Sequence, residues 1–236
     1  GTSKRIPRER KQMSGGGINR DTDILGLVDV QPTFMPGGEL AVAEGDAVVP
    51  IINRLLGRFD HAFATQDWHP AGHSSFASAH PGHRPYDTIA MPYGQQVLWP
   101  DHALQGTPNA ALHRDLEMAK LEVIIRKGFH PAIDSYSTFF ENDRRTATGL
   151  DGWLRQRGFR RLFLAGLATD FCVAWSAEDA VRLGYEVVMI EDACRGIGIP
   201  LGIGIPQTGG RTTVEQARER LLAIGVRVIT SSELIA

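Results

Sequence analysis

Short apolar runs alternate with stretches of helical periodicity along most of the chain. Apolar runs bounded by charged residues or glycine are typical of strands that are buried on both faces. Such runs occupy residues 23–30, 61–65, 123–125, 160–166, 186–190 and 226–230. Apolar residues at helical spacing predict helices from Asp46 to Phe59, after Gly149, around Cys172 and from Thr213 to Ile224. The alternation predicts an α/β fold: three-layer, with a mostly parallel doubly wound sheet of about six strands and helices on both faces.

The chain is long enough for one large core, and no linker-like change of composition divides its 236 residues. We therefore expect a single domain over residues 21–236. Residues 1–12 are typical of a vector-derived remnant, followed by Met13 as the expected native start and a glycine-rich lead-in. Residues 1–20 are accordingly not expected to belong to the fold.

The composition argues against several classes of function. A formal net charge of −2 with scattered basic residues gives no footprint for nucleic acid or a membrane surface. No apolar run approaches the roughly eighteen residues of a membrane span. The chain has only two cysteines, Cys172 and Cys194, which favours a cytoplasmic enzyme with free thiols over a disulfide framework. A small neutral substrate is compatible with this composition.

Four chemically reactive side chains stand at predicted strand ends. Asp29, Asp67 and Lys127 each close a strand, and Cys172 lies where a strand turns into a helix. In parallel sheets the site forms at the carboxyl ends of the strands. We therefore expect four separate segments to converge on one rim of the sheet.

Cys172 is predicted to be a nucleophile, because the start of a helix favours a thiolate and an oxyanion beside it. Asp29 could accept the thiol proton, and Lys127 could stabilise the thiolate. Taken singly, a buried cysteine is more often packing, an aspartate at a strand end commonly caps a helix, and a lysine there usually points to solvent. Their joint placement favours a catalytic triad.

A long segment between the second and third strands is rich in proline, glycine and histidine. Six of the eight histidines lie between His69 and His113, which favours a function for it. Asp67 and His69 are two residues apart, and His102 would complete a site for one divalent metal ion, with Zn, Fe or Mn suited to these ligands. The pair by itself is as compatible with surface polar residues. His73 is a further candidate through water, whereas His80 and His83 are expected to be solvated.

Two further features have weaker interpretations. The sequence Gly-Ile-Gly-Ile-Pro at 196–200 recurs at 202–206 and predicts a loop rather than a phosphate cradle. Phe34, Trp99 and Tyr136 could be core residues, although each lies just beyond one of the reactive segments.

Together these residues resemble a family of proteins, the nicotinamidases/pyrazinamidases of the isochorismatase-like, or cysteine hydrolase, superfamily. The resemblance covers nearly the whole chain from Asp23 onward. Its motifs are Val-Asp-Val-Gln at 28–31 with Phe34, Gln-Asp-Trp-His at 66–69, Trp-Pro-Asp-His at 99–102, Arg-Lys-Gly at 126–128, Asp-Ser-Tyr-Ser at 134–137 and Gly-Leu-Ala-Thr-Asp-Phe-Cys-Val at 166–173. The family often has Asn-Asp after the first motif, where this chain has Pro32-Thr33.

The resemblance implies roles for individual residues. Asp29, Lys127 and Cys172 match the catalytic triad. A cis peptide at Leu167–Ala168 would aim the N–H groups of Ala168 and Cys172 at one oxyanion. The residues that match the metal ligands are Asp67, His69 and His102, and those that match the ring pocket are Phe34, Trp99 and Tyr136.

The resemblance also implies an activity: metal-dependent hydrolysis of nicotinamide, and of pyrazinamide, to the acid and ammonia through a Cys172 thioester, in cytoplasmic NAD salvage. An N-carbamoyl amidase is disfavoured by the set of metal ligands. An isochorismatase is disfavoured by Cys172, which those enzymes lack, and an inactive scaffold is disfavoured by the intact triad. The metal's identity and the oligomeric state are left open, and a homo-oligomer is compatible with the sequence.

Overall fold

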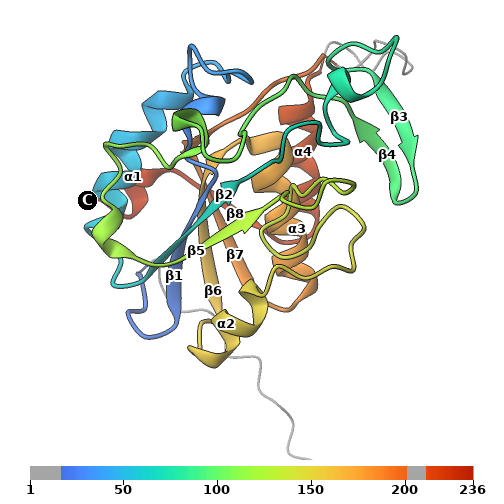
Figure 1. Ribbon diagram of the computed structural model, residues 1–236. Helices are drawn as coiled ribbons and strands as arrows, with labels where there is room; N and C mark the ends of the chain where they lie inside the picture. The colour runs from blue at the N-terminus through green and yellow to red at the C-terminus, as the bar shows by residue number, and fades with distance from the viewer. Residues whose placement is uncertain (1–16, 201–210, 236) are drawn as a thin grey trace, which may run out of the picture.

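Six strands form one parallel sheet in the order β5-β2-β1-β6-β7-β8 (Figure 1). The computed structural model describes residues 17–200 and 211–235, so the expected vector-derived remnant at residues 1–12 and the second Gly-Ile-Gly-Ile-Pro copy lie outside the described residues. The strands are β1 (Asp23–Val28), β2 (Ala62–Asp67), β5 (Leu121–Lys127), β6 (Arg161–Leu167), β7 (Glu186–Arg195) and β8 (Arg227–Ile229). The predicted parallel sheet of about six strands is confirmed.

Helices cover both faces of this sheet. The helix α1 (Val48–Leu56) lies on one side, and α3 (Ala174–Arg182) and α4 (Thr213–Ala223) lie on the other (Figure 1). A shorter helix, α2 (Leu150–Gln156), precedes β6. Within the described residues, no helix is both long and apolar enough to cross a membrane.

The central strands approach one another closely because glycine replaces a side chain at two points. A Cβ on Gly26 of β1 would lie 2.4 Å from the ring of Phe63. A Cβ on Gly166 of β6 would lie 2.1 Å from the carbonyl oxygen of Val28, and Gly166 has φ +123°. Since few residues other than glycine adopt that conformation, β6 can end against β1 only with glycine there. This contact brings the segment after β6 beside the residue that follows β1.

The long segment between the second and third predicted strands contains a β-hairpin that the sequence pattern did not predict. Strands β3 (Thr88–Met91) and β4 (Gly94–Val97) pair antiparallel and project from the body of the molecule (Figure 1). The side chains of β3 alternate between exposed and half-buried, so the hairpin carries little of the apolar pattern that reveals a core strand.

Several element boundaries differ from the predicted ones by a few residues, and two differences lie at the end of β7 and after β6. Strand β7 runs to Arg195, five residues beyond the predicted end. The predicted strand was too short because Asp192 interrupts the apolar pattern. In the structure the Asp192 carboxylate accepts hydrogen bonds from Ser231, so the strand continues through it. After β6 the chain forms a π-helical turn, Thr169–Val173, before α3 begins. Cys172 lies in that turn.

Candidate active site

Lys127 contacts both other members of the predicted triad. Its Nζ lies 2.7 Å from Asp29 Oδ2 and 3.4 Å from Cys172 Sγ. It also donates a hydrogen bond of 2.8 Å to the carbonyl oxygen of Ser135. The side chains of Lys127 and Asp29 are completely buried. The structure therefore brings a carboxylate, an ammonium and a thiol from the ends of three strands to one point.

Asp29 follows β1 directly, with a backbone φ of +48°. Its Oδ1 accepts a hydrogen bond of 2.7 Å from the hydroxyl of Thr65, and its N–H donates to the same hydroxyl. Its Oδ2 forms the ion pair with the Lys127 ammonium at 2.7 Å. Burial raises the pKa of Asp29, and the charge of Lys127 opposes that rise. Because burial disfavours the ionised form, this carboxylate is suited to accept a proton.

Cys172 is buried, and so is Cys194; neither forms a disulfide. Burial raises the pKa of the Cys172 thiol well above its usual range, the Lys127 ammonium lowers it, and the charge and hydrogen bond of Asp29 raise it. The thiol thus keeps its proton until a base removes it. The Leu167–Ala168 peptide is cis, as the resemblance implies.

Asp67, His69 and His102 form a compact cluster next to the triad. Asp67 Oδ2 lies 3.0 Å from His69 Nε2 and 3.2 Å from His102 Nε2. One ligand atom from each residue lies within 4.8 Å of the others. Lys127 Nζ is 3.5 Å from Asp67 Oδ1, so the cluster adjoins the triad directly.

The hydrogen bonds around this cluster fit a bound cation. His69 Nδ1 lies 2.7 Å from the carbonyl oxygen of Gly128, and His102 Nδ1 lies 2.7 Å from that of Pro100. A carbonyl can only accept, so both Nδ1 atoms donate and a neutral ring directs the lone pair of its Nε2 toward Asp67. His69 Nε2 is buried, and none of the described residues gives it a well-aligned hydrogen bond. A divalent metal ion would satisfy the two imidazole lone pairs and the carboxylate at once.

His73 lies beside the cluster but uses both of its ring nitrogens elsewhere. Its Nδ1 accepts the N–H of Ser75, and its Nε2 lies 2.8 Å from the carbonyl oxygen of His130. Its ring packs 4.2 Å from that of His69. His73 therefore packs against the ring of His69. It is not one of the three residues whose ligand atoms lie close together, which are Asp67, His69 and His102.

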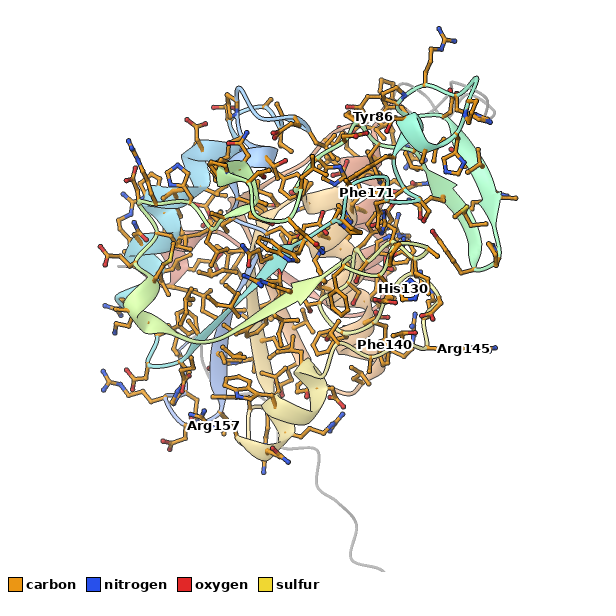
Figure 2. The ribbon with its side chains drawn as sticks, in the orientation of Figure 1. Tyr86, His130, Phe140, Arg145, Arg157 and Phe171 are labelled. Atoms are coloured by element: carbon orange, nitrogen blue, oxygen red, sulfur yellow. The ribbon has the colours of Figure 1, made fainter. Side chains whose placement is uncertain are left out.

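A small pocket opens onto both the triad and the cluster. Trp99 packs edge-on against Phe171, with ring centroids 4.9 Å apart, and Tyr136 lies 5.5 Å from Phe171. Trp99 also contacts Tyr86, with ring centroids 5.9 Å apart; Tyr86 and Phe171 are labelled in Figure 2. The pocket is lined by Phe34, Leu40, Asp67, Trp99, His102, Asp134, Tyr136, Ala168, Phe171, Cys172 and Ile197. The three predicted aromatic residues thus line one pocket with Cys172.

Several residues that organise this site were not predicted. The side-chain amide of Gln31 accepts the backbone N–H of Asp67 and donates to its carbonyl oxygen, which fixes the end of β2. The side-chain amide of Gln96 donates to Asp134 and to the Tyr136 hydroxyl. Thr65 could have been predicted to have a role at the site, because it is a polar residue in a buried strand. Gln31, Asp134 and Phe171 stand inside the quoted motifs without a role assigned to them.

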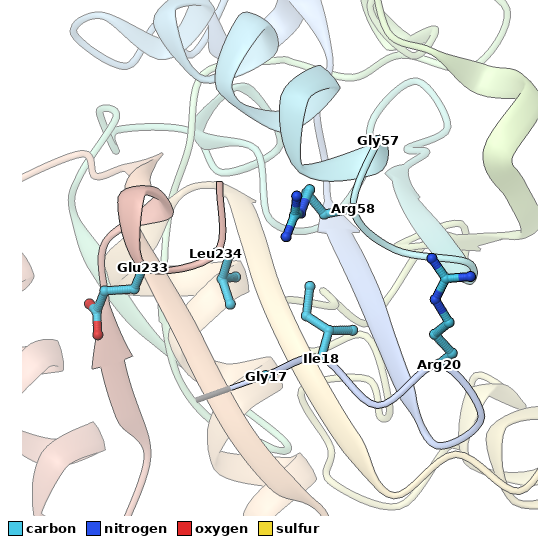
Figure 3. Close-up of a pocket in the computed structure, with 7 residues that line it drawn as sticks. All are labelled: Gly17, Ile18, Arg20, Gly57, Arg58, Glu233 and Leu234. Atoms are coloured by element: carbon cyan, nitrogen blue, oxygen red, sulfur yellow. The ribbon is translucent and has the colours of Figure 1, made fainter. Parts of the chain in front are cut away.

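Another hollow lies beside the end of α1, away from these residues. It is lined by Gly17, Ile18, Arg20, Gly57, Arg58, Glu233 and Leu234 (Figure 3). Its lining holds no cysteine and no histidine, so it offers neither a nucleophile nor a cluster of metal ligands.

Comparison with known proteins places this geometry in context. The model of the Isochorismatase domain family matches residues 24–231. The chain is 48% identical over 209 residues to a nicotinamidase of Acinetobacter baylyi, covering 89% of this chain and 92% of that protein.

Two solved structures are similar over most of their length. A nicotinamidase/pyrazinamidase of Acinetobacter baumanii superposes with a TM-score of 0.83 at 48% identity, covering 91% of this chain and 98% of that one. A pyrazinamidase of Pyrococcus horikoshii in complex with zinc superposes with a TM-score of 0.67 at 32% identity, covering 88% and 98%. The fold is therefore shared with a nicotinamidase/pyrazinamidase and a pyrazinamidase.

Proposed function

The chain belongs to the isochorismatase domain family, and we propose that it is a metal-dependent amidase that hydrolyses nicotinamide, and pyrazinamide, to the acid and ammonia. One observation carries this proposal: Cys172, Asp67 and His102 line the same small pocket as Trp99 and Tyr136. A flat aromatic amide can place its carboxamide at the thiol and its ring nitrogen at the cluster of ligands in such a pocket. The similarity to the nicotinamidase of Acinetobacter baylyi supports the same substrate.

In the first half of the reaction, Cys172 Sγ attacks the carboxamide carbon. Asp29 takes the thiol proton, and the hydrogen bond between the Cys172 thiol and the Asp29 carboxylate supports this role. Lys127, within hydrogen-bond distance of Sγ, stabilises the negative charge. The N–H groups of Ala168 and Cys172 are proposed to stabilise the oxyanion of the tetrahedral intermediate. Asp29 then gives the proton to the departing nitrogen, so that the C–N bond breaks, ammonia leaves and a Cys172 thioester remains.

In the second half of the reaction, water attacks the thioester carbon. Asp29, ionised again after ammonia has left, takes a proton from this water. The C–S bond breaks, the sulfur recovers a proton, and the carboxylic acid is released. The same base therefore serves both halves of the reaction.

The three ligand residues and the aromatic residues orient the substrate. A divalent ion held by Asp67, His69 and His102 would supply a Lewis-acid contact for the ring nitrogen. Phe34, Trp99, Tyr136 and Phe171 hold the ring and exclude water from it. Zn, Fe and Mn all suit the ligand set, and metal analysis of the purified protein identifies which one is bound.

The cellular setting is proposed from the family. We place the reaction in NAD salvage in the cytoplasm, with a small-molecule substrate and with neither nucleic acid nor a membrane as partner. Assembly as a homo-oligomer is compatible with this role, and its measurement is the mass of the particle in solution.

Ammonia release tests the proposed function. We expect release from nicotinamide and from pyrazinamide, and very little from benzamide, which has the carboxamide but no ring nitrogen. Equal turnover of benzamide would contradict the role of the ligand cluster. Turnover of an N-carbamoyl amide, with none of nicotinamide, would assign the site to a different cysteine hydrolase.

A further inference from the structure

The first Gly-Ile-Gly-Ile-Pro segment reaches the substrate pocket. Ile197 lines the pocket together with Cys172 and Phe171, although the two segments are more than twenty residues apart. Its side chain is partly buried and packs against the hydrophobic core. Ile199, two residues later in the same segment, also packs against the core but does not line the pocket. The motif therefore contributes one of its two isoleucines to the site.

Both glycines that flank Ile197 are required by the local structure. A Cβ on Gly196 would lie 2.2 Å from Val214 Cγ2 and 3.2 Å from Asp170 Oδ1. Gly198 has φ +70°, a conformation that side-chain-bearing residues rarely adopt. The Gly-Ile-Gly sequence is thus needed for a tight turn. This turn packs its backbone against Asp170 and places the Ile197 side chain in the wall of the pocket.

Asp170 holds this turn from the loop that carries the nucleophile. Its Oδ1 accepts the N–H of Ile197 at 2.9 Å, and its Oδ2 accepts the N–H of Gly198 at 2.8 Å. The hydroxyl of Thr213 donates to the same Oδ2 at 2.5 Å and accepts the N–H of Ile199. Asp170 is buried. A carboxylate two residues before Cys172 therefore fixes the position of Ile197 relative to the nucleophile.

We propose that Ile197 is a specificity-determining residue that limits the size of ring the pocket accepts, and that Asp170 is the positioning residue that holds it there. This inference rests on the proposed hydrolysis of aromatic amides. One extra or missing methylene group in a hydrophobic pocket changes kcat/KM by about 10- to 200-fold. Removing the end of the Ile197 side chain therefore opens room for a substituent that the wild-type pocket rejects.

The test compares nicotinamide with nicotinamides that carry one methyl group at different ring carbons. For each enzyme the measured quantity is the kcat/KM for a methylated substrate divided by that for nicotinamide. We expect Ile197→Ala to raise this ratio about tenfold or more for at least one isomer. Ile199→Ala is the matched control, because it removes the same atoms from the same segment outside the pocket. Its ratios are expected to equal those of the wild type.

Asp170 is tested through the same ratio, which cancels any general loss of activity. Asp170→Asn turns one acceptor into a donor that faces a backbone N–H, so Ile197 loses its fixed position and the ratio rises for the same isomer. Thr213→Val removes the hydroxyl that donates to Asp170 and should also raise the ratio. Thr213→Ser keeps a hydroxyl at this position and should show the wild-type ratio. Because Asp170 acts through Ile197, the Asp170→Asn change should add little to the ratio of Ile197→Ala.

The outcomes separate this inference from the proposed function. If the wild-type protein releases no ammonia from nicotinamide, the proposed function fails. If the wild type is active and Ile197→Ala shows the same ratios as Ile199→Ala, the role of Ile197 is wrong. If Asp170→Asn changes the ratio in the Ile197→Ala background as much as in the wild type, Asp170 does not act through Ile197.

Discussion

The Lys127 ammonium lies 2.7 Å from the Asp29 carboxylate, and neither side chain is exposed to solvent. Removing one partner of a buried ion pair leaves the other charge uncompensated, which typically costs about 3–5 kcal/mol. The same ammonium lies 3.4 Å from Cys172 Sγ. This pair therefore links the stability of the fold to the chemistry of the thiol.

Lys127→Met should lower both stability and activity. We expect the free energy of unfolding to fall by about 3–5 kcal/mol and ammonia release to fall by about 10²-fold or more. Denaturant unfolding and an ammonia assay measure the two effects. In the double variant Asp29→Asn/Lys127→Met the stability loss should be smaller than the sum of the single losses, and a simple sum would contradict the pairing.

Cys172→Ala should abolish ammonia release from nicotinamide while the protein stays folded. The thiol supplies the electron pair that attacks the carboxamide, and no other cysteine lines the pocket. The unfolding free energy should change by about 1 kcal/mol, since one buried sulfur is lost. Mass spectrometry of the wild type quenched during turnover should detect an acyl group on Cys172. Retained turnover in Cys172→Ala would rule out the nucleophile.

The activity should be lost in acid as Asp29 becomes protonated. Burial raises the pKa of Asp29 despite Lys127, so the acid limb of kcat/KM lies above the roughly 3.9 of a free aspartate. The hydrogen bond from Thr65 lowers the pKa of Asp29, so its removal in Thr65→Val should move the acid limb to higher pH. Thr65→Ser keeps the hydroxyl and should leave the limb in place. An unchanged limb in Thr65→Val would mean that another group titrates.

Gly128→Ala should weaken metal binding. The added Cβ would lie 2.6 Å from His69 Cε1 and 2.9 Å from Asp67 Oδ1, so the two ligands cannot keep their positions. We expect a loss of about 10- to 100-fold in metal affinity, measured by competition with a chelator. Gly72→Ala is the matched control: its φ of +74° is close to the +70° of Gly128, but nothing lies within 4 Å of its added Cβ. Equal losses in the two variants would point to backbone strain instead.

His102→Ala should reduce the bound metal and raise the KM for nicotinamide. It removes one of three ligands and leaves Asp67 and His69, which hold an ion less tightly. Elemental analysis after dialysis and steady-state kinetics measure the two effects. His83→Ala, which changes an exposed histidine of the same segment, should alter neither. An unchanged metal content in His102→Ala would contradict the ligand assignment.

Much of the fold was predictable because the central strands, such as β1 and β6, are buried on both faces. An all-buried strand such as β1 must be a continuous apolar run, and that pattern is visible without any knowledge of its neighbours. The hairpin β3–β4 was missed because its side chains face solvent as often as they face the protein. The site was predictable to the extent that parallel strands end on one rim, which groups Asp29, Asp67 and Lys127 before any distance is known.

The amino-acid sequence by itself determined the alternation of strands and helices, and with it the rim on which the reactive residues gather, since both follow from local apolar periodicity and from the direction of parallel strands. Only the tertiary structure decided which side chains complete the site. Thr65 donates a hydrogen bond to Asp29, which is 36 residues away in the sequence. The backbone N–H of Ile197 donates to Asp170, which is 27 residues away, and this contact holds Ile197 at the pocket. Such partners are fixed by how segments pack in three dimensions, and no local pattern records them.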